Sequence, residues 1–371
     1  MRGSYRTGGF DTLGGSDRMR DKTDTAVSNP VVAEIALVIY PDCQLSAIYG
    51  LTDLFRLAVT TARMVDEREA PIIRVTHWQQ ASDGVACSYD SHPEKPHRIT
   101  HIIVPPSLVM PHDLPSMRAL SGWMTSNHEK GAVLCSVCAG AFVLAETGLL
   151  EGREVTTHWA FADALGSRFP DLKVDAGRII VDDGDIITAG GILAWTDLGL
   201  TLVERLLGAG AMLETARFLL IDPPRQAQRP YSSFIPKLDH SDETIRSVQH
   251  WLQSHVTSEL SVTMLADRAG LEERTFLRRF KAATGLRPTE YVQQIRIARA
   301  REALELTRRS VEQIAWEVGY GDPSGFRKLF NRVTGLGPAE YRKRFGVALR
   351  HTTRDEGSSR TMVALEEARP T

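Results

Sequence analysis

The chain has 371 residues, 42% of them hydrophobic, and a net charge of −2. This length predicts two domains. No apolar run reaches membrane length, which argues against a membrane partner, and four cysteines without a framework spacing indicate a reducing compartment. We therefore expect a cytoplasmic protein.

The first 30 residues are rich in Gly, Ser, Asp and Arg and lack the apolar stretch of a signal peptide. We expect residues 1–30 to form a disordered tail, and residues 347–371 another. Residues 222–240 contain four prolines, which indicates a semi-rigid linker. The predicted domains are the segments 31–221 and 241–346.

In residues 31–221, short apolar runs alternate with helical stretches. The expected strands are 35–40, 72–76, 102–104, 133–137, 179–181 and 186–188. The expected helices are 49–64, 117–129, 139–147 and 196–207. This alternation predicts an α/β domain with a flavodoxin-like parallel sheet and helices on both of its faces.

One site stands out in this domain. The segment Val133-Leu-Cys-Ser-Val-Cys138-Ala-Gly140 predicts a strand that turns directly into a helix, with Cys138 at the turn. The positive end of a helix dipole lowers a thiol pKa there and favours a reactive thiolate. We expect His158 to come within reach of Cys138. The alternatives are a buried cysteine with a core histidine, or a redox Cys-x-x-Cys formed with Cys135, which fits a strand residue better.

Residues 241–346 contain one pattern twice, about fifty residues apart. The copies begin at Ala266 and Ala315, and each carries a glycine stop, two phenylalanines four residues apart and a Gly-x-x-Pro-x-Glu-Tyr ending. Repeats of this size are copies of one supersecondary unit. A helix with a capping residue, a glycine turn and a second helix form a helix-turn-helix. We therefore predict an all-α domain with two such units.

The second helix of each unit turns its phenylalanines to one side and basic or polar residues to the other. The outward residues are Arg274, Thr275, Arg278 and Lys281 in the first copy, and Ser324, Arg327, Lys328 and Asn331 in the second. Such side chains suit base edges and phosphates, although a single basic helix face is more often merely solvated. Between the copies, 289–306 predicts one helix of roughly 27 Å, close to the ~34 Å between successive major-groove faces.

Charge is divided unevenly between the two predicted domains. Residues 241–346 hold 18 Lys and Arg against 13 Asp and Glu, and the rest of the chain is acidic. A basic module joined to an acidic one fits a DNA-binding domain tied to a domain that does not touch DNA.

Residues 241–346 resemble the DNA-binding domain of the AraC/XylS family. The resemblance rests on Leu260-Ser-Val-Thr-Met-Leu-Ala266, Gly319-Tyr-Gly-Asp-Pro-Ser and Gly335-Leu-Gly-Pro-Ala-Glu-Tyr341. Gly325 departs from it, because a larger residue is usual there. The resemblance implies a transcriptional regulator that binds promoter DNA and works with RNA polymerase, and it favours an activator.

Residues 31–221 resemble the ThiJ/PfpI superfamily (class I glutamine amidotransferase-like), in the form carried by the GlxA-like group of AraC-type regulators. The segments that carry the resemblance are 138–159, 189–198 and 50–55. It implies a sensor that binds a small-molecule effector and forms a homodimer, without a cofactor or metal. The expected effector-binding residues are Cys138, His158, Ala139, Thr157 and Gln44.

Two other functions stay open. The first is a cysteine-dependent amidase or hydrolase fused to a DNA-binding domain. Against it, Ala47 stands where enzymes of the superfamily have an acid, and Pro106 stands where they supply a backbone N–H to an oxyanion. The second is a regulator whose N-terminal domain only dimerises. We expect no catalytic residues, and we expect the effector to act through the linker.

Overall fold

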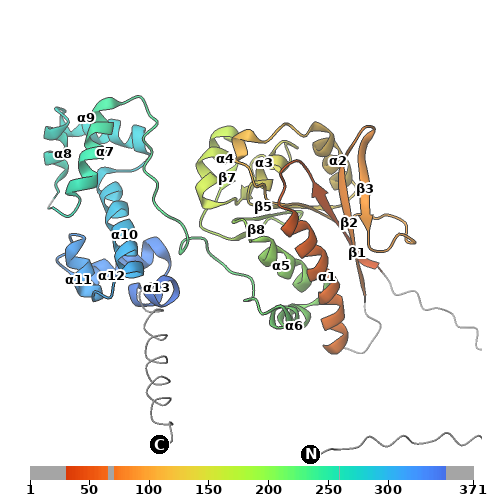
Figure 1. Cartoon of the computed structure of the whole chain (residues 1–371). Helices are drawn as coiled ribbons and strands as arrows, with labels where there is room; N and C mark the ends of the chain where they lie inside the picture. The colour runs from red at the N-terminus through yellow and green to blue at the C-terminus, as the bar shows by residue number, and fades with distance from the viewer. Residues whose placement is uncertain (1–30, 66–70, 259, 348–371) are drawn as a thin grey trace, which may run out of the picture.

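The computed structural model describes residues 31–65, 71–258 and 260–347, so the predicted tails lie outside the described residues except for Val347. An α/β body and an all-helical body are joined by one crossing of the chain (Figure 1). The predicted pair of fold classes is confirmed.

The N-terminal domain is built on a seven-stranded sheet in the order β3-β2-β1-β4-β5-β9-β8. The strands are β1 (Val31–Ile39), β2 (Ile72–Ala81), β3 (Gly84–Asp90), β4 (His101–Val104), β5 (Val133–Val137), β8 (Ile180–Asp182) and β9 (Ile186–Ala189). The inner pairs are parallel, whereas β3 and β8 pair antiparallel at the two edges. Two short strands, β6 (Glu154–Val155) and β7 (Lys173–Val174), form a separate pair.

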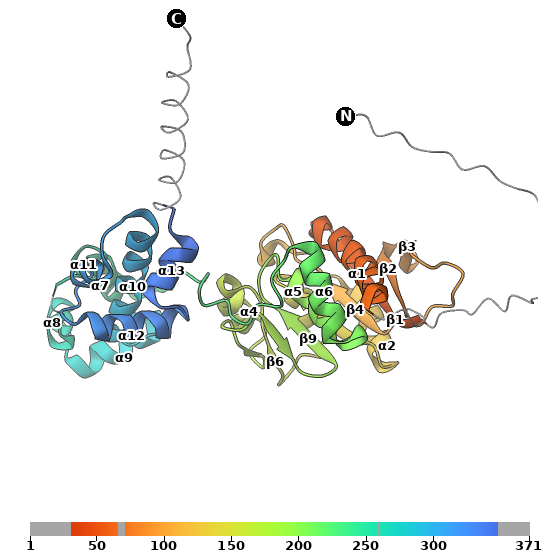
Figure 2. The same cartoon turned by 90° about the horizontal axis from the view of Figure 1, so that it is seen from below.

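Helices cover both faces of this sheet (Figures 1 and 2). On one face lie α1 (Leu45–Val65), α5 (Trp195–Leu207) and α6 (Ala209–Leu219); on the other lie α2 (Arg118–Glu129), α3 (Gly140–Ala145) and α4 (Ala162–Arg168). The central strand β1 serves both layers, because Leu37 points into the first core and Val38 into the second. Side chains alternate between the faces of a strand, and β1, which is buried on both faces, is apolar apart from Glu34.

The C-terminal domain is helical throughout its described residues. Its helices are α7 (Glu243–His255), α8 (Val262–Arg268), α9 (Glu273–Thr284), α10 (Pro288–Leu306), α11 (Val311–Glu317), α12 (Pro323–Thr334) and α13 (Pro338–Phe345). The two helix-turn-helix units are α8–α9 and α11–α12. The predicted connecting helix is α10, and it belongs to both cores: Ile295 packs in the first and Leu304 in the second.

Local chemistry sets the ends of these short helices. Ser310 and Gln313 form a capping box at the start of α11, and Asp322 accepts hydrogen bonds from two backbone N–H groups at the start of α12. Gly319 has a φ of +89° after α11, which a residue with a side chain rarely adopts. No helix in the described ranges is long and apolar enough to cross a membrane.

Candidate functional sites

The candidate effector site lies at the carboxyl edge of the parallel strands. β2 lies on one side of β1 and β4 on the other, so the strand order reverses between β1 and β4. Open α/β sheets bind ligands at such a switch point. The loops after these strands bond to each other: the Gln44 N–H donates to the Pro106 carbonyl at 2.7 Å, and the Tyr40 hydroxyl donates to the Pro105 carbonyl at 2.6 Å.

Cys138 follows β5, the strand beside β4. Its φ is +54°, a left-handed conformation that is uncommon for a residue with a side chain. The helix α3 begins two residues later at Gly140. A Cβ at Gly140 would lie 2.5 Å from the Val104 carbonyl oxygen, so only glycine permits this approach to β4. The predicted turn from strand directly into helix is present.

The thiol of Cys138 is not activated, and the prediction of a lowered pKa is wrong. Cys138 is 2% exposed. Burial raises the pKa of its thiol to about 11, and the N–H groups of Ala139 and Gly191 offset this only in part. A thiolate loses more solvation than a neutral thiol when it is buried, and α3 has only six residues with which to oppose that loss. The thiol is therefore neutral at pH 7.

His158 is engaged elsewhere. Its Nδ1 accepts a hydrogen bond from the Ala160 N–H at 3.1 Å, and its ring packs against Trp159 and Phe161. Partial burial lowers the pKa of His158, so the ring is neutral at pH 7. Among the described residues, no hydrogen bond joins His158 to Cys138. The predicted approach has not produced a Cys–His dyad.

Three of the predicted effector residues meet in one place. The Thr157 hydroxyl donates to the Cys138 carbonyl at 2.8 Å, and Cys138, Ala139 and Thr157 are all buried. Gln44 enters from the loop after β1, where its buried side-chain oxygen has no hydrogen-bond partner. At the start of α5, the buried indole N–H of Trp195 also lacks a partner. The part of Cys138, Ala139, Thr157 and Gln44 in effector binding stays a prediction.

Gln228 joins this site from the predicted linker. It is 3% exposed, its Nε2 donates to the Thr157 carbonyl at 2.8 Å, and its Oε1 accepts from the Trp159 N–H at 2.9 Å. Gly190 makes room for it, because a Cβ there would lie 1.9 Å from Nε2. A glutamine in a proline-rich segment carries no sequence signal for such a contact.

The candidate DNA-binding faces lie on α9 and α12. On α9 the two phenylalanines are fully buried, and the predicted outward residues Arg274, Arg278 and Lys281 are exposed, with Thr275 half-buried. Within the described part of the chain, no hydrogen bond or ion pair engages the three basic side chains. The predicted orientation of this helix is present in the structure, and its contact with DNA stays a prediction.

The outer face of α12 is oriented in the same way but carries less free charge. The predicted residues Ser324, Arg327, Lys328 and Asn331 are all exposed, opposite the buried phenylalanines. Arg327, however, forms an ion pair with Glu312 of α11. Gly325, in the first turn of α12, has no side chain that could contact DNA. The two units therefore present different surfaces despite their common fold.

Two family models match the chain. The DJ-1/PfpI family matches residues 59–205, and a helix-turn-helix domain matches residues 265–344. The transcriptional regulator GlxA of Rhizobium meliloti is 29% identical over 58% of this chain and 67% of its own length. The regulator CdhR of Pseudomonas aeruginosa is 29% identical over 60% of this chain and 67% of its own. The chain therefore combines a DJ-1/PfpI domain with a helix-turn-helix domain, and it is similar to transcriptional regulators of the GlxA-like group. It is also similar to an AraC family transcriptional regulator from Pseudomonas putida, whose crystal structure covers 50% of this chain and 99% of its own at 18% identity, with a TM-score of 0.38.

The loop after β4 and the start of α1 lack the donor and the acid that the amidase alternative would need at the predicted positions. Pro105 and Pro106 have no N–H to donate, and the Pro106 carbonyl is already bonded to Gln44. Ala47, at the position predicted to lack the acid, is fully buried. An oxyanion hole needs donors aimed at the reacting oxygen. The loop after β4 supplies acceptors instead.

Proposed function

We propose that this regulator binds promoter DNA through α9 and α12, and that an effector at the carboxyl edge of its sheet controls the binding. The observation that supports the DNA part is the repetition: one helix, α10, connects two units whose outer faces are exposed and basic. Its 19 residues span roughly 28 Å, which suits adjacent major grooves on one side of a duplex.

The effector site is supported by polar atoms that lack partners. Gln44 offers a buried acceptor in the loop after β1. Trp195 offers a buried donor at the start of α5, where its ring lies against Gly50 of α1. Buried polar groups are nearly always hydrogen-bonded, so an unpaired donor and acceptor at one sheet edge favour a ligand that satisfies both. Such an effector carries at least one donor and one acceptor. We assign Cys138, Ala139, Thr157 and His158 to the same effector site.

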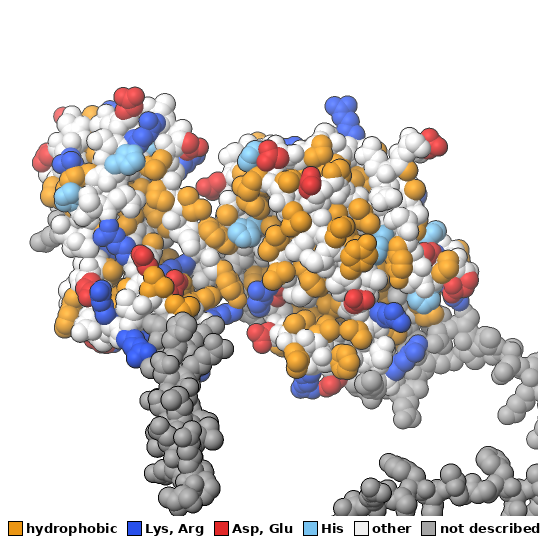
Figure 3. All heavy atoms as spheres, in the orientation of Figure 1, with side chains coloured by type: hydrophobic (Ala, Val, Ile, Leu, Met, Phe, Trp, Pro, Cys, Tyr) orange, Lys and Arg blue, Asp and Glu red, His pale blue; other side chains and the backbone are white. Residues whose placement is uncertain are grey.

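The DNA-binding proposal predicts steep salt dependence. The test uses a duplex that the full-length protein has selected from a random pool. The protein should bind this duplex more weakly as salt rises. The logarithm of the binding constant should fall with the logarithm of the salt concentration, with a slope of about −0.9 per phosphate contact. Sedimentation of the same complex tests the homodimer, for which the exposed apolar side chains on and after α6 provide a surface: Leu213, Phe218 and Leu220 (Figure 3). Equal affinity for the selected and a scrambled duplex would contradict the proposal.

We also infer that Cys138 is not a nucleophile and that the chain is not an enzyme. At pH 8, a thiol with a pKa of about 11 should alkylate roughly 200-fold more slowly than one of ordinary pKa near 8.5. The rate should climb as pH rises, because only the thiolate reacts. Iodoacetamide labelling followed by mass spectrometry measures this, with the urea-unfolded chain as control. Labelling of folded Cys138 at the unfolded rate at pH 7 would overturn the inference.

Likeness to AraC-type proteins supports, as a proposal, a sign of regulation and a location. On that basis we place the protein in the cytoplasm, as an activator that works with RNA polymerase at the promoter. Transcription in vitro from a promoter carrying the selected site, with and without the protein, measures the sign. A fall in transcript would make it a repressor.

A further inference from the structure

The segment between the two domains is hydrogen-bonded to both of them. Its bonds to the N-terminal domain end at Gln228, and its bonds to the C-terminal domain begin at Arg229. Ala227 pairs antiparallel with Arg178, and the Gln228 N–H donates to the Gly177 carbonyl at 2.9 Å. The next carbonyls, of Arg229 and Ser232, accept from the C-terminal domain. Figure 2 shows the single crossing that this segment makes. A semi-rigid spacer was the expectation, but the segment makes specific contacts at each end.

At the N-terminal end, the side chain of Gln228 is the anchor. Besides Thr157 and Trp159, its amide reaches the Arg178 carbonyl at 2.8 Å. These bonds hold the stretch that contains His158. Because Thr157 also donates to the Cys138 carbonyl, only two hydrogen bonds separate Gln228 from the cysteine turn.

At the C-terminal end, the anchor is Arg301 on α10. Arg301 is 8% exposed, and its guanidinium donates to the carbonyls of Ser232 and Arg229, the latter at 3.0 Å. It also lies 5.5 Å from the centre of the Tyr341 ring, whose hydroxyl donates to Glu305 at 2.6 Å. The fork of a guanidinium can bond two carbonyls at once, which an ammonium group holds less rigidly.

A tight turn connects the two anchors. The N–H groups of Tyr231 and Ser232 both donate to the Gln228 carbonyl, at 2.8 and 3.1 Å. A displacement of Gln228 is therefore carried to the carbonyls that Arg301 holds. We call Gln228, this turn and Arg301 the linker clasp.

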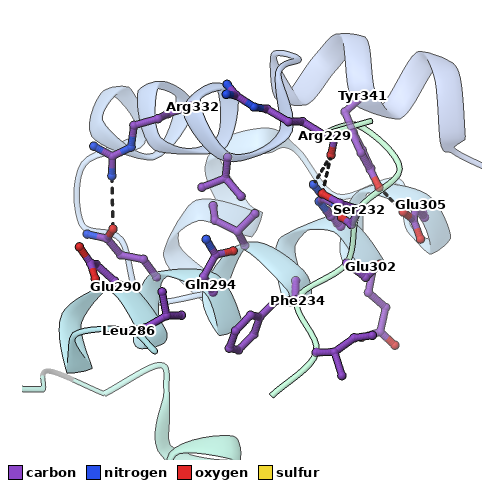
Figure 4. A pocket seen from close by; sticks show the side chains of 17 residues that line it. Arg229, Ser232, Phe234, Leu286, Glu290, Gln294, Glu302, Glu305, Arg332 and Tyr341 are labelled. Atoms are coloured by element: carbon purple, nitrogen blue, oxygen red, sulfur yellow. Dashed lines mark hydrogen bonds between the residues drawn. The ribbon is translucent and has the colours of Figure 1, made fainter. Parts of the chain in front are cut away.

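Beside the clasp, a groove of about 760 Å³ runs between the linker and α10 (Figure 4). Its walls include Phe234 from the linker, Glu290 from α10 and Arg332 from α12. Because this space is not filled by side chains, packing alone does not fix the linker against α10. The linker is held to the C-terminal domain by the two carbonyls that Arg301 binds and by the contact of the Phe234 ring with Tyr291. Tyr231 also packs against Phe345, and the Lys237 carbonyl accepts a hydrogen bond from Gln249.

We propose that Gln228 and Arg301 are positioning residues that couple the effector site to the DNA-binding units. The proposal rests on the function proposed above. A ligand that shifts the 156–159 stretch shifts Gln228, and through the clasp it changes where α10 sits relative to the sheet. Coupling is reciprocal: if opening of the 156–159 stretch changes the affinity for DNA, DNA binding must change the free energy of that opening by the same amount.

Reciprocity allows a test that needs no effector. Hydrogen exchange at the Trp159 amide, whose acceptor is Gln228, is measured in the full-length protein with and without the selected duplex. We expect DNA to change the exchange rate at least fivefold in the wild type, the lower end of typical coupling. In Arg301→Met the duplex should still bind with unchanged affinity, but the change at Trp159 should vanish. Arg301→Lys should restore part of it.

Two further variants sharpen the result. Gln228→Leu removes the sensor-side anchor and should also abolish the DNA effect, whereas Gln226→Leu should behave as wild type because Gln226 is exposed and two residues away. If Gln228→Leu does not fold, Arg301→Met still tests the coupling, because that variant keeps Gln228 and the hydrogen bonds that Gln228 makes. A DNA effect that persists in Arg301→Met, or no effect in the wild type, overturns the coupling. Failure of the wild type to bind any selected duplex overturns the proposed function itself, and the coupling with it.

Discussion

Replacing Arg274 and Arg278 together by alanine should remove most specific DNA binding from the full-length protein while leaving its fold intact. Both side chains are exposed on α9, away from the buried phenylalanines, and neither bonds to another described residue. A bidentate contact to a base contributes about 1–3 kcal/mol, and a phosphate contact adds to the salt slope. Fluorescence anisotropy with the selected duplex at several salt concentrations measures the loss of binding free energy and the change in the salt slope. Thermal unfolding checks the fold.

The matched control removes two cations from the second unit, in Arg327→Ala/Lys328→Ala. Binding should weaken less, because Arg327 already pairs with Glu312 and Gly325 contributes no side chain. Arg279→Ala provides a second comparison: Arg279 binds Asp242 with 2.7 and 2.8 Å hydrogen bonds and thereby ties α9 to α7. Its loss should lower stability before it lowers affinity. An equal loss of affinity from both double variants would show that the units do not differ as their surfaces suggest.

The C-terminal domain was predictable because its determinants are local. Caps such as Ser310 and Asp322, glycines such as Gly319 and phenylalanines at helical spacing each act within a few residues. The repeat adds a second copy of every signal. Helix ends and faces therefore follow from the sequence, and the shared helix α10 follows from the absence of Gly and Pro in residues 289–306.

The N-terminal domain was predictable in its layers but not in the state of its site. The turn at Cys138 is encoded locally, whereas the pKa of its thiol depends on burial by segments distant in the sequence. Gln228 and Thr157 are 71 residues apart in the sequence, and no pattern around Gln228 predicts their hydrogen bond. The edge strand β3 is half exposed with no clean alternation, and α4 and α6 follow other elements closely, so their patterns are weak.

A buried charge cluster at the opposite edge of the sheet was also not predictable. Arg74 on β2 is 1% exposed; its Nε donates to Asp90 at 2.9 Å, and its NH1 lies 3.6 Å from Glu34, which is equally buried. Cys87, Asp90 and His97 place possible ligand atoms within 4.8 Å of one another. Arg74 already supplies the positive charge there, so a metal ion would face a guanidinium. We assign the cluster to stability.

Arg74→Met should therefore lower the free energy of unfolding by about 3–5 kcal/mol, because it leaves buried carboxylates without their cation. Methionine replaces the aliphatic part of the arginine side chain, so the packing of that part is largely kept. The hydrogen bond from Arg74 holds the pKa of Asp90 below its usual value. This stabilisation is fully present above the ordinary carboxyl pKa near 4 and is lost as pH falls through the lowered value. Urea unfolding of both proteins between pH 7 and pH 4 measures the difference.

In Arg74→Met the effect of pH on the free energy of unfolding has the opposite sign. Protonation stabilises the folded variant, because it neutralises a buried carboxylate that has lost its partner. The difference in the free energy of unfolding between wild type and Arg74→Met should therefore become smaller as pH falls toward 4. Arg217→Met is the matched control: Arg217 pairs with Glu214 on the surface of α6, where it is 70% exposed, and such pairs contribute about 0–1 kcal/mol. If Arg74→Met cost no more than Arg217→Met at pH 7, the cluster would not stabilise the sheet, and zinc titration of the Cys87, Asp90 and His97 group would become the next measurement.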